Sequence, residues 1–202
     1  MIILKKRNIK MKYVGAISDT DILINLAKVN RLDLLEYLFE QIIIPQYVYD
    51  IEIKKKAGIY YSVIIQAIDK ENSRFKILDR KKSKALNMLS KDIIDEKKKV
   101  IGSGESECAG YAIALRIPII ISDNYTEFKW LEEFITLTHR NVLTLCVYFN
   151  KITGDVGKEI FDDINRQLER PTQNTFEHFY KKSINAFIQN GWCKYLGIDI
   201  DK

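Results

Sequence analysis

The sequence predicts an α/β domain of three layers, in which helices cover both faces of a mainly parallel central sheet. Short β-rich runs alternate with amphipathic helical patterns through the first 150 residues, which is the order that builds parallel sheets. Three apolar runs, residues 13–18, 42–44 and 117–121, each lead to acidic residues. The carboxyl ends of parallel strands meet at one edge of a sheet, so these acids are expected to lie close together.

Helices are predicted wherever apolar side chains recur at helical spacing between these runs. Pro45 fits the first turn of one helix, where a missing N–H does no harm, and Asn30 is a candidate N-cap for another. Gly102 and Gly104 break the chain before a helix at about 104–116. The other predicted helices span residues 22–29, 32–38, 59–68, 81–99 and 124–133. Residues 75–78 fit an edge strand, and residues 142–148 fit a helix or a strand.

Residues 151–202 differ from the part before them, because only helical patterns occur there. We therefore expect a basic leader at residues 1–12, one α/β domain at residues 13–150, and a helical C-terminal extension at 151–202 that packs on the domain. The length of 202 residues and the hydrophobic content of 47% are sufficient for this core.

Charge is nearly balanced, with 32 Lys and Arg against 27 Asp and Glu, but the basic residues gather in clusters. The clusters are residues 5–7, 54–56, 80–82 and 97–99. Basic surfaces around an acidic centre suit a nucleic-acid substrate. Solvated helix faces explain any single cluster equally well.

Cysteine use and hydropathy predict a cytoplasmic protein that does not enter a membrane. The three cysteines do not have the spacing of metal ligands, and their odd number argues against a disulfide framework. No apolar run approaches the roughly 20 residues that a membrane span needs.

The acids after the first and third runs are candidates for a metal site. Asp19 and Asp21 stand one residue apart after the first run, where metal coordination and helix capping both explain them. Asp123 ends the run of isoleucines between Ser122 and Asn124, and an Asx-turn is its alternative role. Several carboxylates at one sheet edge repel one another unless a cation neutralises them.

Glu105 lies in the first turn of its predicted helix, on the same stripe as Cys108 and Ala109. A glutamate on an apolar stripe points toward the core, where an unpaired charge is costly, and a divalent cation is a natural partner. A capping-box role is the alternative. Glu107 leans toward another face and is expected beside the site or in solvent.

Four motifs together resemble the PIN domain family, in the variant whose helix begins Gly-x-Gly-Glu-x-Glu. They are residues 18–24, 44–48, 102–107 and 121–123. The resemblance covers about residues 13–150 and implies a three-layer α/β/α fold. It further implies a metal-dependent nuclease, usually an endoribonuclease and often the toxin of a toxin–antitoxin pair.

On the family's pattern, Asp19 matches the first acid, Glu105 the third and Asp123 the fourth, while Thr20 matches a hydroxyl beside the first acid. The expected cofactor is one or two Mg²⁺ or Mn²⁺ ions bound by these three acids and Asp21.

The second acid is where the sequence departs from the family. The family places a glutamate six residues after the proline, and Ile51 stands there. Asp50 and Glu52 flank it and cannot share a helix face, so at most one belongs to the site. A one-residue shift in the helix start would bring either inward, and Glu52 is favoured.

The expected reaction is hydrolysis of RNA by metal-activated water. His139 and His178 are distant in sequence from the acids, which disfavours histidine-based chemistry. A phosphatase of the haloacid dehalogenase type is disfavoured because Ile22 and Leu23 stand where a glycine-threonine pair is needed. A degenerate module that binds RNA or a protein is the remaining alternative. Expected partners are RNA, an antitoxin protein and a second copy of the chain.

Overall fold

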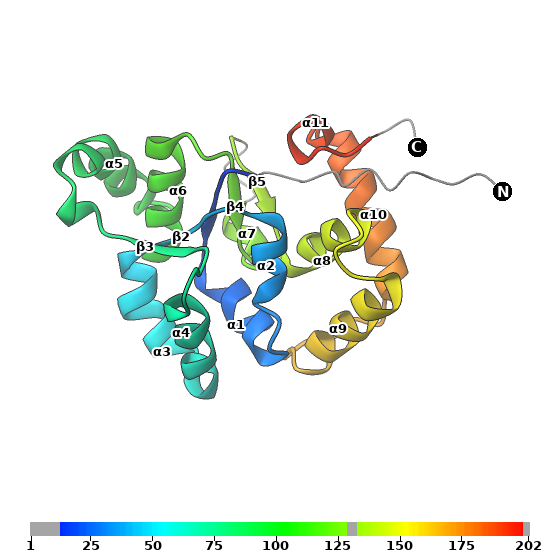
Figure 1. Cartoon of the computed structure of the whole chain (residues 1–202). Coiled ribbons are helices and arrows are strands. Elements are labelled where there is room, and N and C mark those ends of the chain that lie inside the picture. Colours follow the sequence, from blue (N-terminus) through cyan, green and yellow to red (C-terminus); the bar gives the residue numbers. More distant parts are fainter. Residues whose placement is uncertain (1–12, 129–132, 200–202) are drawn as a thin grey trace.

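The computed structural model describes residues 13–128 and 133–199, and over these residues the chain forms one five-stranded sheet. All strand pairs are parallel, and the strand order is β3-β2-β1-β4-β5 (Figure 1). The strands are β1 (Ala16–Ser18), β2 (Ile42–Pro45), β3 (Phe75–Leu78), β4 (Ile119–Ile121) and β5 (Ile135–Leu137). The predicted α/β class and the parallel sheet are therefore confirmed.

Helices connect the strands and continue beyond the sheet. Those before β4 are α1 (Thr20–Lys28), α2 (Asp33–Leu38), the π turn η1 (Val48–Ile53), α3 (Lys54–Lys56), η2 (Gly58–Tyr60), α4 (Tyr61–Asp69), η3 (Arg80–Lys82), α5 (Lys84–Lys97) and α6 (Ser103–Leu115). Those after β4 are α7 (Tyr125–Phe128), α8 (His139–Tyr148), α9 (Gly154–Arg166), α10 (Phe176–Gln189) and α11 (Cys193–Leu196).

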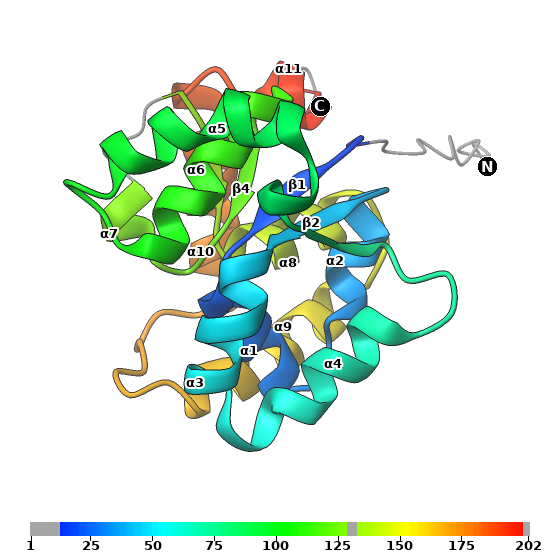
Figure 2. The same ribbon diagram turned by 90° about the vertical axis from the view of Figure 1, so that its left-hand side faces the viewer.

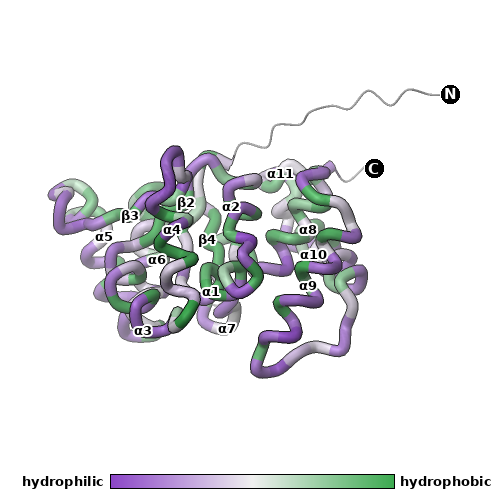
Figure 3. The backbone as a smooth tube through the Cα atoms, turned by 60° about the horizontal axis from the view of Figure 1, so that its bottom comes forward, coloured by the Kyte–Doolittle hydropathy of each residue, from purple (hydrophilic) through white to green (hydrophobic). Residues whose placement is uncertain are grey.

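The sheet forms the middle of three layers. Helices α5 and α6 lie on one side of it, while α2, α4 and α8 lie on the other side (Figure 2). Strands β1, β2 and β4 are buried on both faces, which explains why their sequences are apolar runs rather than alternating ones, whereas the edge strand β3 is only partly buried. Strand β4 is hydrophobic along its length, whereas the lysine-rich α3 is hydrophilic (Figure 3).

The strand order reverses between β1 and β4. The chain runs from β1 outward through β2 to β3, then returns to pair β4 with β1 and continues to β5. Ile17 and Ser18 pair with Ile120 and Ile121, so the residues after these strands share one edge. Such a switch point is where open α/β sheets bind ligands, because the connections leave in opposite directions and open a crevice.

The C-terminal helices pack on the domain, as the sequence predicts. Helices α9 and α10 contact α8 and each other. The Tyr13 hydroxyl donates a hydrogen bond to the carbonyl oxygen of Leu196 at 2.6 Å, which ties α11 to the start of the domain. The domain boundaries stay a prediction, and the predicted leader at 1–12 lies outside the described residues.

Three local features differ from the sequence expectations. Pro45 is the last residue of β2 and pairs with Leu78, so it does not lie in the first turn of a helix. Strand β5 is missed because three residues, Ile135–Leu137, are too few to show a period. Asn30 is not an N-cap: it adopts φ 53° and donates its N–H to Ala27, closing the end of α1, which suits an asparagine in the left-handed region. Residues 142–148, which fit a helix or a strand, belong to α8.

Among the described residues, no helix combines the length and the apolar character that crossing a bilayer requires.

Gly110 sets how closely α5 and α6 approach. A Cβ at Gly110 would overlap the Ile94 side chain, which is fully buried. Gly110→Ala is expected to lower the free energy of unfolding by about 1–3 kcal/mol, despite the better helix propensity of alanine. Urea unfolding measures this, and Gly154→Ala is the control because a Cβ there meets nothing within 4 Å. Equal midpoints for the two variants would contradict the close packing.

Candidate active site

Asp19 occupies the centre of the site, directly after β1. It is 1% exposed and caps α1: Oδ1 accepts a hydrogen bond from the Thr20 N–H at 2.7 Å. Oδ2 accepts one from the Ser122 hydroxyl at 2.8 Å, so the carboxylate joins the ends of β1 and β4. Capping and a place in the site are therefore compatible roles.

The pKa of Asp19 is raised to about 7, first by burial and then by the negative charges of Glu105 and Asp21. The two hydrogen bonds act in the opposite direction but do not cancel these effects. Asp19 forms no ion pair with a cation of the described residues, although its charge raises the pKa of Lys56.

Glu52 enters the site because the helix after β2 contains a π turn. Hydrogen bonding from i to i+5 adds one residue to that turn, so Glu52 takes the inward direction while Ile51 is 49% exposed. The Glu52 carboxylate is buried and accepts hydrogen bonds from the Thr20 hydroxyl at 2.9 Å and from Lys56 Nζ at 3.1 Å.

Asp50 lies outside this group of acids. Its carboxylate accepts a hydrogen bond from Gln46 Nε2 at 2.5 Å and pairs with Lys54 at 3.6 Å. Of the two candidates for the second acid, the structure therefore brings Glu52 and not Asp50 to Thr20 and the carboxylates beyond it.

Glu105 and Glu52 fit together because positions 102 and 104, just before Glu105, are glycines. A Cβ at Gly102 would overlap Glu105 Oε2, and a Cβ at Gly104 would overlap Glu52 Oε1. Glu105 is 5% exposed, and its Oε1 accepts a hydrogen bond from Asn124 Nδ2 at 3.0 Å. The Gly-x-Gly-Glu motif thus provides both the third acid and the space for two carboxylates.

Asp123 is held from two sides at the end of β4. Its Oδ1 accepts hydrogen bonds from the His139 backbone N–H and lies 2.8 Å from His139 Nδ1, and its Oδ2 accepts one from Asn25 Nδ2 at 2.6 Å. Burial alone would raise the pKa of Asp123, but His139 and Asn25 together lower it. This carboxylate is therefore ionised and fixed in direction.

His139 and Glu127 are two site residues that sequence reasoning missed. His139 is 16 residues from Asp123, and no motif links them. Glu127 on α7 accepts a hydrogen bond from the Gly102 N–H at 3.1 Å, and its charge raises the pKa of Glu105 and of Asp21. Its position four residues after Asp123 is the signal that could have found it.

Asp21 and Glu107 differ in their surroundings. Asp21 is half-buried in the first turn of α1, and its pKa is raised by burial and by the charges of Asp123, Glu52 and Glu127, against the lowering effect of Lys56. Glu107 lies 3.7 Å from the Arg80 guanidinium and is also bonded to the Tyr47 backbone. Glu107 therefore supports the chain around β2 rather than facing Asp19.

The donor chemistry of the site suits a divalent cation. In the part of the chain that the structure describes, no three Asp, Glu, His or Cys side chains form a ready metal-binding group. The pKa values of Asp19, Asp21 and Glu105 are nevertheless all raised, first by burial, with neighbouring carboxylates adding to the effect. Carboxylate oxygens are the donors that Mg²⁺ and Mn²⁺ prefer, and a divalent charge would relieve this repulsion.

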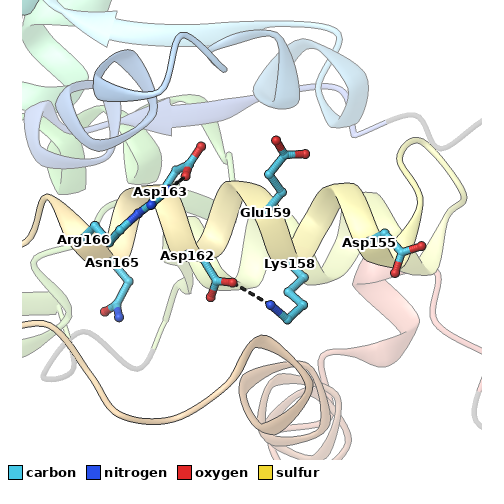
Figure 4. Close-up of a pocket in the computed structure, with 7 residues that line it drawn as sticks. All are labelled: Asp155, Lys158, Glu159, Asp162, Asp163, Asn165 and Arg166. Atoms are coloured by element: carbon cyan, nitrogen blue, oxygen red, sulfur yellow. Dashed lines mark hydrogen bonds and ion pairs between the residues drawn. The ribbon is translucent and has the colours of Figure 1, made fainter.

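A cleft of about 550 Å³ opens beside the acids. Its lining includes Asp21, Asp123, His139 and Lys56. Another hollow, of about 580 Å³, runs along α9 and is lined by Asp155, Lys158, Glu159, Asp162, Asp163, Asn165 and Arg166 (Figure 4). All seven belong to one helix and none to the acid group, so the cleft beside the acids is the candidate active site.

The fold and the site together define a class: a doubly wound α/β domain with carboxylates gathered at its topological switch point. A family model described as PIN domain matches residues 15–134, more than half of the chain, and the chain belongs to the PIN domain family. PIN domains have a nuclease-type fold and typically use divalent metal ions. No curated protein matches the chain.

The raised pKa of Asp19 predicts a pH-dependent stability of the metal-free protein. A carboxyl whose pKa rises from 3.8 to about 7 on folding stabilises the fold at low pH, and this contribution is lost as the pH rises through 7. The scale is about 1.4 kcal/mol for each pKa unit. With a chelator present, we expect the melting temperature to fall between pH 5 and 8 by less in Asp19→Asn than in the unaltered protein.

Asp50→Asn is the matched control, because this carboxylate is more exposed and lies outside the acid group. If the melting temperatures of Asp19→Asn and of the unaltered protein fall equally between pH 5 and 8, the raised pKa of Asp19 is not the cause of the pH dependence.

Proposed function

We propose that this PIN domain is a metal-dependent endoribonuclease that hydrolyses RNA phosphodiesters. The observation that carries the proposal is the buried carboxylate of Asp19, which joins the ends of β1 and β4 and whose pKa is raised to about 7 by burial and by Glu105 and Asp21. A cluster of this kind at a switch point is costly for folding and is typical of functional sites. The nuclease-type fold of the PIN domain family also supports a nuclease function.

Each side chain has a defined task in this proposal. Asp19, Asp21 and Glu105, with Glu52 and Asp123 beside them, would hold Mg²⁺ or Mn²⁺, which supplies a water of lowered pKa and neutralises charge on the phosphate. The Thr20 hydroxyl orients Glu52, and Ser122 orients Asp19. His139 and Asn25 keep Asp123 ionised and pointing in one direction.

A role as the toxin of a toxin–antitoxin pair is the biological form of this proposal. An antitoxin would be expected to cover the cleft beside Asp21 and Lys56 and so exclude RNA. A gene for a small partner directly next to the gene of this chain would support it.

A degenerate binding module is the second candidate function, and one observation favours it. Lys56 Nζ lies 3.1 Å from Glu52 Oε2, so a cation of the protein already pairs with the second acid. A chain of this kind would bind RNA or a protein without cleaving it.

Cleavage of labelled single-stranded RNA with Mg²⁺ or Mn²⁺ decides between these functions. Asp19→Asn and Glu105→Gln are each expected to lower kcat at least about 100-fold, because charge stabilisation at a reacting phosphate is worth several kcal/mol. Asp50→Asn is the control and is expected to cleave like the unaltered protein. If the unaltered protein binds RNA but neither metal supports cleavage, the binding module replaces the nuclease.

The π turn gives a sharper test of Glu52. Deleting Ile51 removes the extra residue of the turn, so the helix becomes α-helical while Glu52 keeps its inward direction. We expect the deletion variant to retain cleavage within about tenfold, whereas Glu52→Gln loses at least about 100-fold. Circular dichroism and thermal melting establish that both variants fold. Loss of cleavage in a folded deletion variant, with Glu52→Gln active, would exclude Glu52 as the second acid.

A further inference from the structure

The cleft beside the acids has a second wall that is positively charged. Its lining includes Lys28 from α1 and His139 and Arg140 from the start of α8. Leu168, from the connection between α9 and α10, also lines the cleft. Its volume of about 550 Å³ is in the range of sites that hold a nucleotide-sized ligand.

Arg140 forms no salt bridge with a carboxylate of the described residues. Its Nε is buried and has no hydrogen-bond partner among the described residues. Its guanidinium carbon lies 4.1 Å from the centre of the Phe179 ring, so stacking holds the plane of the group. Burial lowers the pKa of Arg140, against the opposing effect of the Asp123 charge; the Asp123 carboxylate is itself hydrogen-bonded by His139 and Asn25.

Lys28 is likewise not neutralised. Its ammonium group donates to Asn25 Oδ1 at 3.2 Å and to the Gln167 carbonyl at 3.5 Å, and it forms no ion pair with a carboxylate of the described residues. Both cations line the cleft without a salt bridge to a carboxylate of the described residues, so each has N–H donors available to an anion. Arginine and lysine in such a setting are the side chains that bind phosphate.

We propose that Arg140 and Lys28 bind a backbone phosphate of a single RNA strand next to the phosphate at the acids, with Phe179 stacking on the Arg140 guanidinium and holding it in place. The proposal rests on the proposed nuclease function, because it orders the same strand across the same cleft. It assigns a task to the C-terminal extension, since α10 supplies Phe179 and the α9–α10 connection supplies Leu168. Arg140 and Phe179 lie beyond residues 15–134, which match the family model, whereas Lys28 lies within them.

Binding without metal tests the subsite independently of cleavage. The probe is a fluorescein-labelled oligouridine about ten nucleotides long, titrated with the protein in a chelator while anisotropy is recorded. Arg140→Gln and Lys28→Gln are each expected to weaken binding about tenfold, the size of one charge-assisted hydrogen bond. The slope of log affinity against log salt is expected to fall by about 0.7 for each phosphate contact removed.

Arg116→Gln is the matched control. It removes the same charge from an exposed residue just after the last turn of α6, while Glu105 lies in the first turn of that helix, next to the acids. Affinity and salt slope are expected to stay within about twofold of the unaltered protein. Arg140→Lys keeps the charge but loses the planar fork and is expected to bind with intermediate affinity.

Kinetics separate this proposal from the nuclease proposal. If the protein cleaves RNA, Arg140→Gln is expected to raise KM about tenfold and to leave kcat within about twofold, because the contact is equal in ground and transition states. Unchanged KM and unchanged affinity in Arg140→Gln would overturn the subsite and leave the nuclease intact. Absence of cleavage, with the affinity losses as expected, would overturn the nuclease alone.

Two further outcomes also test the proposed phosphate subsite. If Arg140→Gln does not fold, Lys28→Gln decides alone, because Lys28 is on the surface and its affinity loss or its absence is measurable. If calorimetry detects binding of inorganic phosphate but no oligouridine binding is detected, the cleft is a small-anion site and the strand proposal is wrong.

Discussion

Repulsion among carboxylates at the edge between β1 and β4 is the interaction on which the rest of the site depends. The carboxyl ends of the parallel strands lie at one edge of the sheet. The strand order reverses between β1 and β4, so the residues that follow these two strands meet in the crevice between them. Asp19 is nearly inaccessible there, and neighbouring acids add to the cost of its charge. The fold tolerates this cost because a large core surrounds the edge and stabilises it independently.

Hydrogen-bond donors and Lys56 surround the acids and limit this repulsion without removing it. Asp123 is satisfied by His139 and Asn25, and Glu52 by Thr20 and Lys56. Asp19 receives only neutral donors, from Ser122 and the Thr20 backbone. Asp19 is therefore a nearly inaccessible carboxylate without an ion pair among the described residues. A cation bound there would be attracted strongly, because the local dielectric is low.

Much of the fold could be predicted from the sequence because its signals are local. Isoleucine runs mark β2 and β4, and amphipathic spacing marks most helices. Asp19, Glu105 and Asp123 could be named because acids that follow buried strands, or open the helix beside them, must meet at a parallel edge. The second acid stayed open between Asp50 and Glu52, since a π turn leaves no mark in a hydrophobic pattern.

Other parts of the site could not be predicted because they depend on contacts between distant segments. The bond between His139 and Asp123 requires α8 to start beside β4, which depends on the three-residue strand β5. Phe179 reaches Arg140 only because α10 packs on α8. No spacing rule within a single helix or strand contains this information.

The π turn at Val48–Ile53 also bears on how such chains are classified. A sequence alignment without a gap in this helix places Ile51, which is exposed, in the column where the family has its glutamate. Judged by that column alone, the chain lacks the second acid and would be classified as an inactive relative. One inserted residue that bulges the backbone instead leaves both flanks of the helix where they were. Among chains with this architecture, a missing acid in a column is therefore evidence of lost activity only after the neighbouring column has been inspected in three dimensions.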